Sequence, residues 1–252
     1  MRRTRVRILD GGSLEVNGFQ AFWNRGPAEQ IRIPCYSVLI EHADGLYLFD
    51  TGFDLQHTKN AIPGAKPRQR QHQTLPGQLA LINLSPRGVA YVINSHFHFD
   101  HCGGNRALEK ADVICHRREY EAAENPLNFE AGSYSDVGFL SAMSDRRIFL
   151  FSGDQELADG IWLFETPGHT AGHYSLLVEL TGRRPMLFTA DAVYSKKSLD
   201  LMCISSFHLD PVAATRSMAR VAQLAEDWDA ELFFPHDPVH YTDYRKSPNF
   251  YE

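Results

Sequence analysis

Short apolar runs separated by polar turns follow one another along most of the chain, a pattern that predicts many strands. Segment 6–9 alternates charged and apolar residues and predicts a strand that turns at Gly11 and Gly12. Apolar runs at 35–41 and 46–50, on either side of an Ala-Asp-Gly turn, predict a hairpin. Further runs predict strands at 90–94, 113–115, 149–152, 161–165, 175–179, 186–189 and 231–234.

Helical spacing of apolar residues occurs in fewer places. It predicts a short helix from Pro76, a helix over 117–123 and a longer helix over 215–228. Segments 53–73 and 125–145 show no clear periodicity, so we expect two long loops whose roles the sequence leaves open. Strands with interspersed helices predict two sheets packed face to face with helices outside.

Length and charge narrow the possible partners. The 252 residues suit one globular domain over 1–252. The net charge is −6 and no long basic run occurs, so neither nucleic acid nor an anionic membrane is an expected partner. No apolar run reaches the roughly 18 to 20 residues of a membrane span, and the charged start is typical of a strand, not a signal peptide. We expect a cytoplasmic protein that acts on a small molecule, and the sequence predicts no particular oligomeric state.

The four cysteines are scattered without paired spacing. In a reducing cytoplasm we expect them to remain thiols and to pack as small buried hydrophobes. Cys102 directly follows a candidate metal ligand, but this next-door position is expected to point its side chain away from the metal. The other three are Cys35, Cys115 and Cys203.

Four side chains of metal-binding type lie within six residues, just after the predicted strand 90–94. His96 and His98 are two residues apart, so they lie on the same face of an extended segment and can bind one cation. Asp100 and His101 follow on the turn and offer an oxygen and a nitrogen to a second cation nearby. Because packing alone does not require such a cluster, the spacing predicts two metal ions.

Three further candidate ligands follow predicted strands. His169 lies in a glycine-flanked turn, and His236 directly follows the last apolar run. Asp191 follows the run 186–190, where its two carboxylate oxygens can bridge two cations. Imidazole with carboxylate favours zinc, although iron, cobalt or manganese could occupy such a site.

The ligand pattern resembles that of a known superfamily. In chain order the chain carries Asp-Thr-Gly at 50–52, His-x-His-x-Asp-His at 96–101, Thr-Pro-Gly-His-Thr-Ala-Gly-His at 166–173, Asp191 and His236. This order resembles the metallo-β-lactamase superfamily over residues 46–236. The resemblance implies the α/β class and a four-layer αββα sandwich with a dinuclear site at the edge of its sheets.

The resemblance also implies a role for each candidate ligand. It places three histidines on the first metal, namely His96, His98 and His169. It places Asp100, His101 and His236 on the second metal, with Asp191 and a hydroxide bridging the two ions. Asp50 is expected to orient a ligand without binding metal, and His173 to hydrogen-bond within its loop.

The substrate within this superfamily depends on the surroundings of the metals. His101 argues against true β-lactamases, which usually lack a histidine after the aspartate of the motif. Glyoxalase II thioester hydrolases share the ligand set but carry a helical C-terminal domain, and only sixteen residues follow His236. Ribonuclease Z-like nucleases need a basic surface and a clamping arm, which this acidic sequence does not show.

The lactonase branch has positive support. Asp191-Ala192-Val193-Tyr194 resembles the Asp-Ala-x-Tyr of N-acyl-homoserine lactonases, in which the tyrosine hydroxyl meets the lactone carbonyl. The candidate catalytic residues are therefore Tyr194 and Asp100. The predicted function is hydrolysis of a five-membered lactone by a hydroxide bridging two zinc ions. N-acyl-homoserine lactone, the substrate of quorum quenching, ranks first.

A near-equal alternative is 4-pyridoxolactonase of vitamin B6 degradation. Segments 10–13, 22–27 and 95–105, with the Phe250-Tyr251 ending, are similar to it. The segment between His101 and His169 is shorter than in that enzyme. This departure leaves the identity of the lactone open. A thioester or phosphoester hydrolase on the same metals, and a non-catalytic metal-binding protein, are further alternatives.

Three aromatic residues follow the first predicted strand. Phe19, Phe22 and Trp23 are expected to line the substrate cleft, either along an acyl chain or stacked on an aromatic ring. Packing in the core is the alternative role for these side chains.

Overall fold

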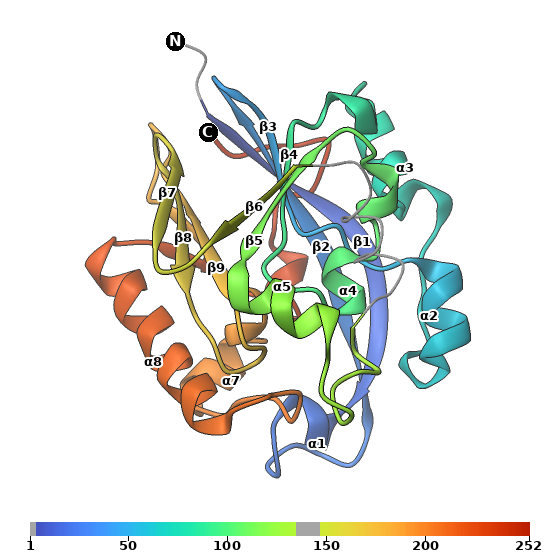
Figure 1. Ribbon diagram of the computed structural model, residues 1–252. Coiled ribbons are helices and arrows are strands. Elements are labelled where there is room, and N and C mark those ends of the chain that lie inside the picture. The colour runs from blue at the N-terminus through green and yellow to red at the C-terminus, as the bar shows by residue number, and fades with distance from the viewer. Residues whose placement is uncertain (1–3, 135–146) are drawn as a thin grey trace.

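Two sheets packed face to face form the body of the molecule (Figure 1). The computed structural model describes residues 4–134 and 147–252. The first sheet has the strand order β1-β2-β3-β4-β5-β6, and the second has the order β11-β10-β9-β8-β7. The strands are β1 (Arg5–Asn17), β2 (Gln30–His42), β3 (Gly45–Phe49), β4 (Tyr91–Ile93), β5 (Asp112–His116), β6 (Ile148–Phe151), β7 (Gln155–Ala158), β8 (Ile161–Glu165), β9 (Tyr174–Val178), β10 (Met186–Phe188) and β11 (Glu231–Phe233).

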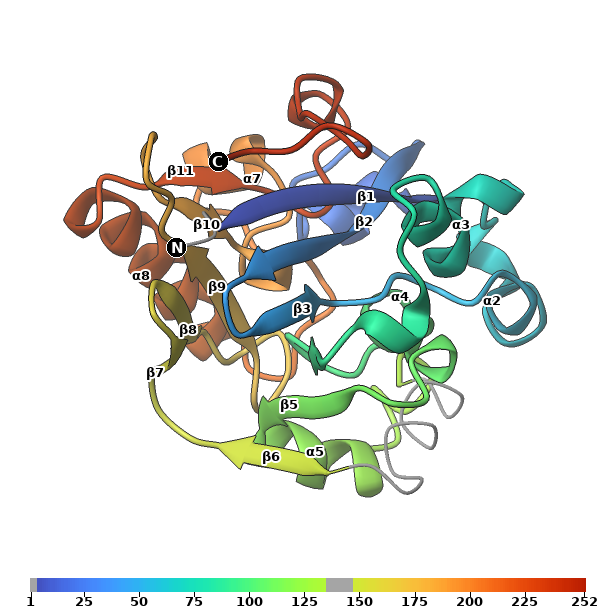
Figure 2. The ribbon, with the colours of Figure 1, turned by 90° about the horizontal axis from the view of Figure 1, so that it is seen from above.

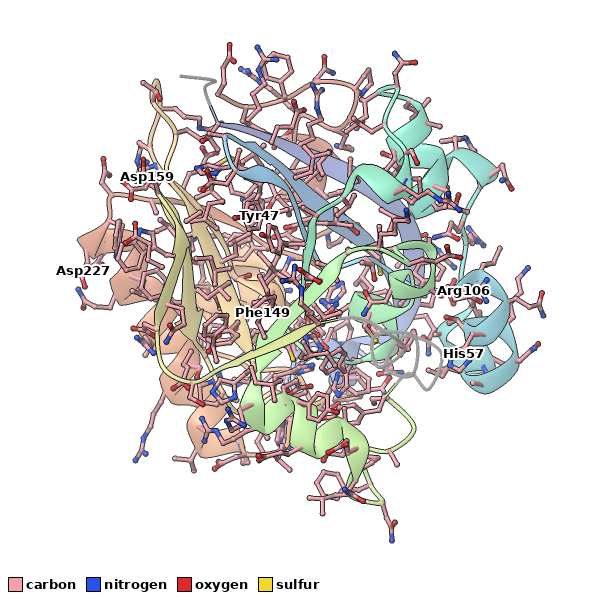
Figure 3. All side chains as sticks on the ribbon, turned by 45° about the horizontal axis from the view of Figure 1, so that its top comes forward. Tyr47, His57, Arg106, Phe149, Asp159 and Asp227 are labelled. Atoms are coloured by element: carbon pink, nitrogen blue, oxygen red, sulfur yellow. The ribbon has the colours of Figure 1, made fainter. Side chains whose placement is uncertain are left out.

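The main core lies between the two sheets. Ile40 of β2 and Leu176 of β9 are both fully buried in one apolar cluster that joins the sheets. Burial of a side chain of this size stabilises the fold by about 1.5–3 kcal/mol. Tyr47 lies inside the sandwich, whereas Asp159 and Asp227 point outward from the rim (Figure 3).

Helices cover the outer faces of both sheets (Figure 2). On the first sheet, Leu79 of α3 packs in a cluster with Val113 of β5. On the second sheet, Met218 and Val221 of α8 pack in a cluster with Leu187 of β10. The helices are α1 (Gly18–Ala21), α2 (Leu55–Ala61), α3 (Leu75–Ala80), α4 (Phe99–Cys102), α5 (Arg117–Glu124), α7 (Lys196–Asp200) and α8 (Pro211–Asp227). The four-layer αββα sandwich expected from the sequence is therefore confirmed.

Parallel pairing brings several loops to the same edge of the sandwich. Strands β3, β4, β5 and β6 run parallel, and β10 runs parallel to β11. The loop after β4 carries the segment 96–101, and the segments after β10 and β11 carry Asp191 and His236. Loops that a rigid scaffold positions in this way are where binding and catalytic side chains concentrate.

The first strand differs from its prediction. The hairpin of β2 and β3 has the predicted antiparallel pairing, but β1 does not turn at Gly11 and Gly12. It continues to its end through a bulge between Asp10 and Ser13. Gly12 has a φ of +94°, and a Cβ there would lie 2.4 Å from the carbonyl oxygen of Arg68. The two glycines therefore allow a bulge and a close contact, not a chain reversal.

Segment 53–73 is more regular than predicted. Helix α2 occupies part of it, because the Asp54 side chain caps the helix by accepting a hydrogen bond from the His57 amide at 2.7 Å. Of the predicted loop 125–145, residues 135–145 lie outside the described residues.

The other helices and strands differ from the predictions only in detail. Helix α8 begins at Pro211, four residues before the predicted start, because Asp210 caps it and proline suits a first helical turn. The apolar pattern does not predict β7, whose four residues are half-buried or exposed. Within the described ranges, no helix is long and apolar enough to cross a membrane.

Candidate metal centre

The first group of candidate ligands consists of three buried histidines. Ligand atoms of His96, His98 and His169 all lie within 4.8 Å of one another. His98 Nδ1 and His169 Nε2 are 3.0 Å apart. His96 Nε2 is buried and has no hydrogen-bond partner among the described residues. Since buried polar atoms nearly always have a partner, this convergent set with its unpaired His96 nitrogen fits a bound metal ion.

Asp191 lies between this group and a second one. Its Oδ2 is 3.2 Å from His169 Nε2 and 4.0 Å from His96 Nε2. Its Oδ1 is 3.0 Å from His101 Nε2 and 3.2 Å from His236 Nε2. Each oxygen of one carboxylate thus faces a different set of imidazoles, which is the arrangement that bridging two cations requires.

Asp100 completes the second group. Its Oδ2 lies 3.6 Å from His236 Nε2 and 3.9 Å from His101 Nε2. The structure therefore brings together all seven residues that the sequence proposes as ligands. It also adds one that was expected only to pack, because Cys35 offers its Sγ within 4.8 Å of ligand atoms of Asp100 and His236.

Hydrogen bonds from outside the two groups orient the imidazoles. Asp50 Oδ2 is 2.7 Å from His101 Nδ1, and the same carboxylate accepts hydrogen bonds from the amide and hydroxyl of Ser95 at 2.8 Å. The Pro34 carbonyl oxygen lies 2.9 Å from His236 Nδ1. Asp50 and Pro34 each hold the Nδ1 side of a histidine ring and leave its Nε2 directed at Asp191. Asp50 therefore has the orienting geometry expected of it.

His173 reaches further than its own loop. Its Nε2 accepts a hydrogen bond from the Asp191 amide at 3.0 Å, so its Nδ1 donates to the Thr166 hydroxyl at 2.8 Å. The expected hydrogen bond within the loop is present. The second one ties this loop to the backbone of the central carboxylate.

Burial and charge shift the pKa values of the two groups of histidines in opposite directions. Burial lowers the pKa of His98 and of His169 to about 3, so both imidazoles are neutral at pH 7 and free to bind metal. Burial also lowers the pKa of His101 and His236, but the Asp191 carboxylate outweighs it and both lie well above their usual value. Burial raises the pKa of Asp191, and these same histidines reverse that effect and hold it well below its usual range.

Glu119 of α5 connects the two histidine-bearing segments. This fully buried carboxylate accepts a hydrogen bond from the Phe97 amide at 2.9 Å through one oxygen. Its other oxygen accepts from the Gly172 amide at 3.2 Å. A Cβ at Gly172 would lie 2.3 Å from the Glu119 nitrogen, so glycine is needed for this approach. The sequence gives no signal for this role, since Glu119 resembles a charged residue on an exposed helix.

A cavity of about 410 Å³ opens onto the metal-binding groups. Its walls include His98, Asp100, Asp191, Tyr194 and His236. A smaller cavity of about 170 Å³ shares Tyr194 and His236 and is lined by both apolar and polar side chains. Any small molecule in the larger cavity therefore lies directly beside the candidate ligands.

Of the three aromatic residues proposed for substrate binding, one lines a cavity and two are exposed. Phe22 lines the smaller cavity. Phe19 lies in α1 with 49% of its surface exposed, and Trp23 is 38% exposed and packs edge-on against His208. Neither Phe19 nor Trp23 belongs to the described walls of the two cavities. The order of apolar and polar residues could not predict the exposure of Phe19 and Trp23, because this exposure depends on how α1 packs.

Tyr194 is one of the buried side chains that line both cavities. Its ring centroid is 4.8 Å from that of His236 and 6.1 Å from that of His169. Burial, followed by the charges of Asp191 and Asp100, raises the pKa of Tyr194 well above its usual value. The hydroxyl is therefore protonated at neutral pH and is available as a hydrogen-bond donor.

Comparison with known proteins places the chain in a well-populated group. The sequence model of the Metallo-beta-lactamase superfamily matches residues 31–245. N-acyl homoserine lactonase AttM of Azorhizobium caulinodans is 29% identical over 268 residues and covers 100% of both chains. N-acyl homoserine lactonase AiiA of Bacillus thuringiensis subsp. kurstaki is 31% identical over 220 residues, or 84% of each chain.

Solved structures give the same result. An N-acyl homoserine lactone hydrolase, with the product N-hexanoyl-L-homoserine bound at its catalytic metal centre, matches with a TM-score of 0.88. It is 26% identical in sequence and covers 100% of both chains. The structural similarity therefore extends over the whole length of the chain, including both sheets.

Zinc-loaded protein is expected to contain about two metal equivalents, and Asp191→Asn to contain at most about one, because the amide is uncharged and has only one oxygen donor. Elemental analysis after dialysis measures this directly. Asp227→Asn, at an exposed position on α8, is the matched control and should retain both metals. At most one equivalent in the fully reconstituted wild type contradicts a two-metal centre.

Glu119→Gln should weaken both the fold and the metal site, since an amide offers only one acceptor oxygen to the two backbone amides. Leaving one buried donor unpaired costs about 1–3 kcal/mol, which denaturant unfolding of the metal-free protein can measure. Zinc titration should show weaker binding in the same variant. Glu121→Gln, at an exposed position on the same helix, is the control. Equal unfolding free energies and equal zinc affinities in the wild type and both variants rule out the connecting role of Glu119.

Proposed function

The chain belongs to the metallo-β-lactamase superfamily, and from that membership we propose that it is a two-metal hydrolase that opens five-membered lactone rings, with N-acyl homoserine lactones as the first substrate. The two relatives and the solved structure named above are N-acyl homoserine lactonases, and AttM and the solved structure match over the full length of the chain. The observation that carries the proposal is Tyr194, a protonated donor on the cavity wall beside the bridging carboxylate.

We propose zinc as the metal, because the donor set combines neutral imidazoles with carboxylates. Bound zinc supplies a nucleophile from water near neutral pH, by lowering the pKa of that water to about 7. All four cysteines are buried and none of them forms a disulfide, which fits the proposed location in the reducing cytoplasm.

The residues around the cavity account for ring opening. Negative charge develops on the carbonyl oxygen of the lactone when water attacks its carbon, and the Tyr194 hydroxyl donates a hydrogen bond to that oxygen. The bond between the carbonyl carbon and the ring oxygen then breaks. Asp100 lines the same cavity and is placed to take a proton from the attacking water and pass it to the departing ring oxygen.

The shape of the cavity suits an acylated lactone. With the lactone ring beside Tyr194, an acyl chain can extend along a largely apolar wall, where each buried methylene contributes about 0.8 kcal/mol. The apolar part of this wall includes Leu14, Val16, Ile33, Ile62 and Phe207. Gln20 and Gln30 on the same wall offer hydrogen bonds to the amide of the acyl group.

The second candidate substrate is 4-pyridoxolactone, a flat bicyclic lactone. Segments 10–13, 22–27 and 95–105 resemble 4-pyridoxolactonase, and one structural observation supports it as well. Gln20 and Gln30 line the cavity with amide groups that the hydroxyl and ring nitrogen of a pyridine can use. Both candidates require the same chemistry at the ester bond.

Tyr194→Phe should lower kcat on the preferred lactone by roughly 10- to 1000-fold, the range for the loss of one oxyanion donor. The metal content should not change, because the phenol is not a proposed ligand. Tyr47→Phe, which removes a hydroxyl inside the sandwich, is the control and should retain full activity. An unchanged rate in Tyr194→Phe would return this side chain to a packing role.

A substrate panel separates the candidates. For an N-acyl homoserine lactonase, kcat/KM should rise as the acyl chain lengthens from four carbons towards eight or ten, since each added methylene is buried. Phe207→Ala, on the apolar wall of the larger cavity, should raise KM more than it lowers kcat, with the exposed Trp23→Ala as the control. Fast opening of 4-pyridoxolactone without hydrolysis of any acyl homoserine lactone favours the second candidate. Turnover of thioesters or phosphodiesters alone contradicts the lactonase proposal.

A further inference from the structure

We propose that the Cys35 thiolate is an additional ligand of the second metal ion, beside Asp100 and His236. The proposal rests on the two-metal centre of the proposed function. Cys35 lies within strand β2, whereas the other candidate ligands lie in segments that follow strands. Its Sγ and one ligand atom from each of the two neighbours form a group in which all atoms lie within 4.8 Å of one another.

Strand geometry directs this side chain toward the metal centre. Residues two apart in a strand point to the same face, and Ile33 lines both cavities. The intervening Pro34 uses its carbonyl oxygen to orient the His236 ring, at 2.9 Å from Nδ1. One short stretch of β2 therefore positions a histidine ligand and places a sulfur beside it.

The surroundings of Cys35 favour a buried ligand over a reactive surface thiol. Only 2% of the residue is exposed, and Leu14, Ile33 and Phe53 pack in the same apolar cluster. A second observation points to a ligand at this site, because the buried His101 Nε2 and Asp191 Oδ1 in the adjoining group have no hydrogen-bond partner among the described residues, and Asp191 Oδ1 lies 3.2 Å from His236 Nε2. When a divalent ion binds, the S–H bond breaks, the proton leaves to solvent, and the sulfur electron pair forms the bond to the metal.

A sulfur donor has a consequence for metal choice. Thiolate is a soft ligand that zinc, cobalt and cadmium accept, whereas manganese and magnesium prefer oxygen. The second site should therefore prefer the thiophilic ions. An all-nitrogen-and-oxygen site discriminates between these metals less.

Cobalt substitution tests the ligand directly. Stepwise addition of Co²⁺ to metal-free protein should produce a thiolate-to-cobalt charge-transfer band in the near ultraviolet as the second equivalent binds. Cys35→Ser should lack this band while still taking up the first equivalent, which also shows that it is folded. Its affinity for the second metal should fall roughly 10- to 100-fold, the range for losing a supporting interaction at a metal site. Cys203→Ser, with its thiol outside both groups, is the control and should retain the band.

A second variant identifies the thiol that produces the charge-transfer band even if Cys35→Ser does not fold. The triple variant Cys102→Ser, Cys115→Ser, Cys203→Ser leaves Cys35 as the single thiol of the chain and should retain the band. Uptake of two cobalt equivalents without any charge-transfer band overturns the Cys35 assignment alone. Failure to bind a second equivalent at all contradicts the two-metal centre, so the two outcomes are distinguishable.

Discussion

The buried carboxylate of Asp191 is the group on which the rest of the site depends. A buried carboxylate is costly unless it is paired and hydrogen-bonded, and here imidazoles approach each of its two oxygens at 3.0 to 3.2 Å. The strands of both sheets end where their loops can supply those imidazoles. The sandwich thus serves to hold ligands from distant parts of the sequence around one anion, and this is the geometry that two cations require.

A surrounding layer of hydrogen bonds fixes each ligand in turn. Asp50 orients His101, and His173 bonds to the Asp191 backbone. Glu119 joins the two histidine-bearing segments through their amides. Networks of this kind are rigid only when every member is satisfied. The layer therefore explains how ligands on loops keep a fixed geometry before any metal binds.

The sequence could predict the ligands because they follow local rules. Histidines two apart share a face of a strand, and an aspartate or histidine directly after an apolar run lies at a sheet edge. Cys35 and Glu119 could not be predicted in this way, because only the packing of β2 and α5 against the loops reveals what their side chains contact. The same limit applies to the bulge at Gly12, since local sequence does not distinguish it from a turn.

The most direct test of a two-metal centre bridged by Asp191 is a zinc-bound crystal structure with anomalous diffraction at the zinc absorption edge. Two anomalous peaks are expected, one on each side of the Asp191 carboxylate. One should lie among His96, His98 and His169, and the other beside His101 and His236. A single peak, or zinc located away from Asp191, would contradict a centre built on one bridging carboxylate.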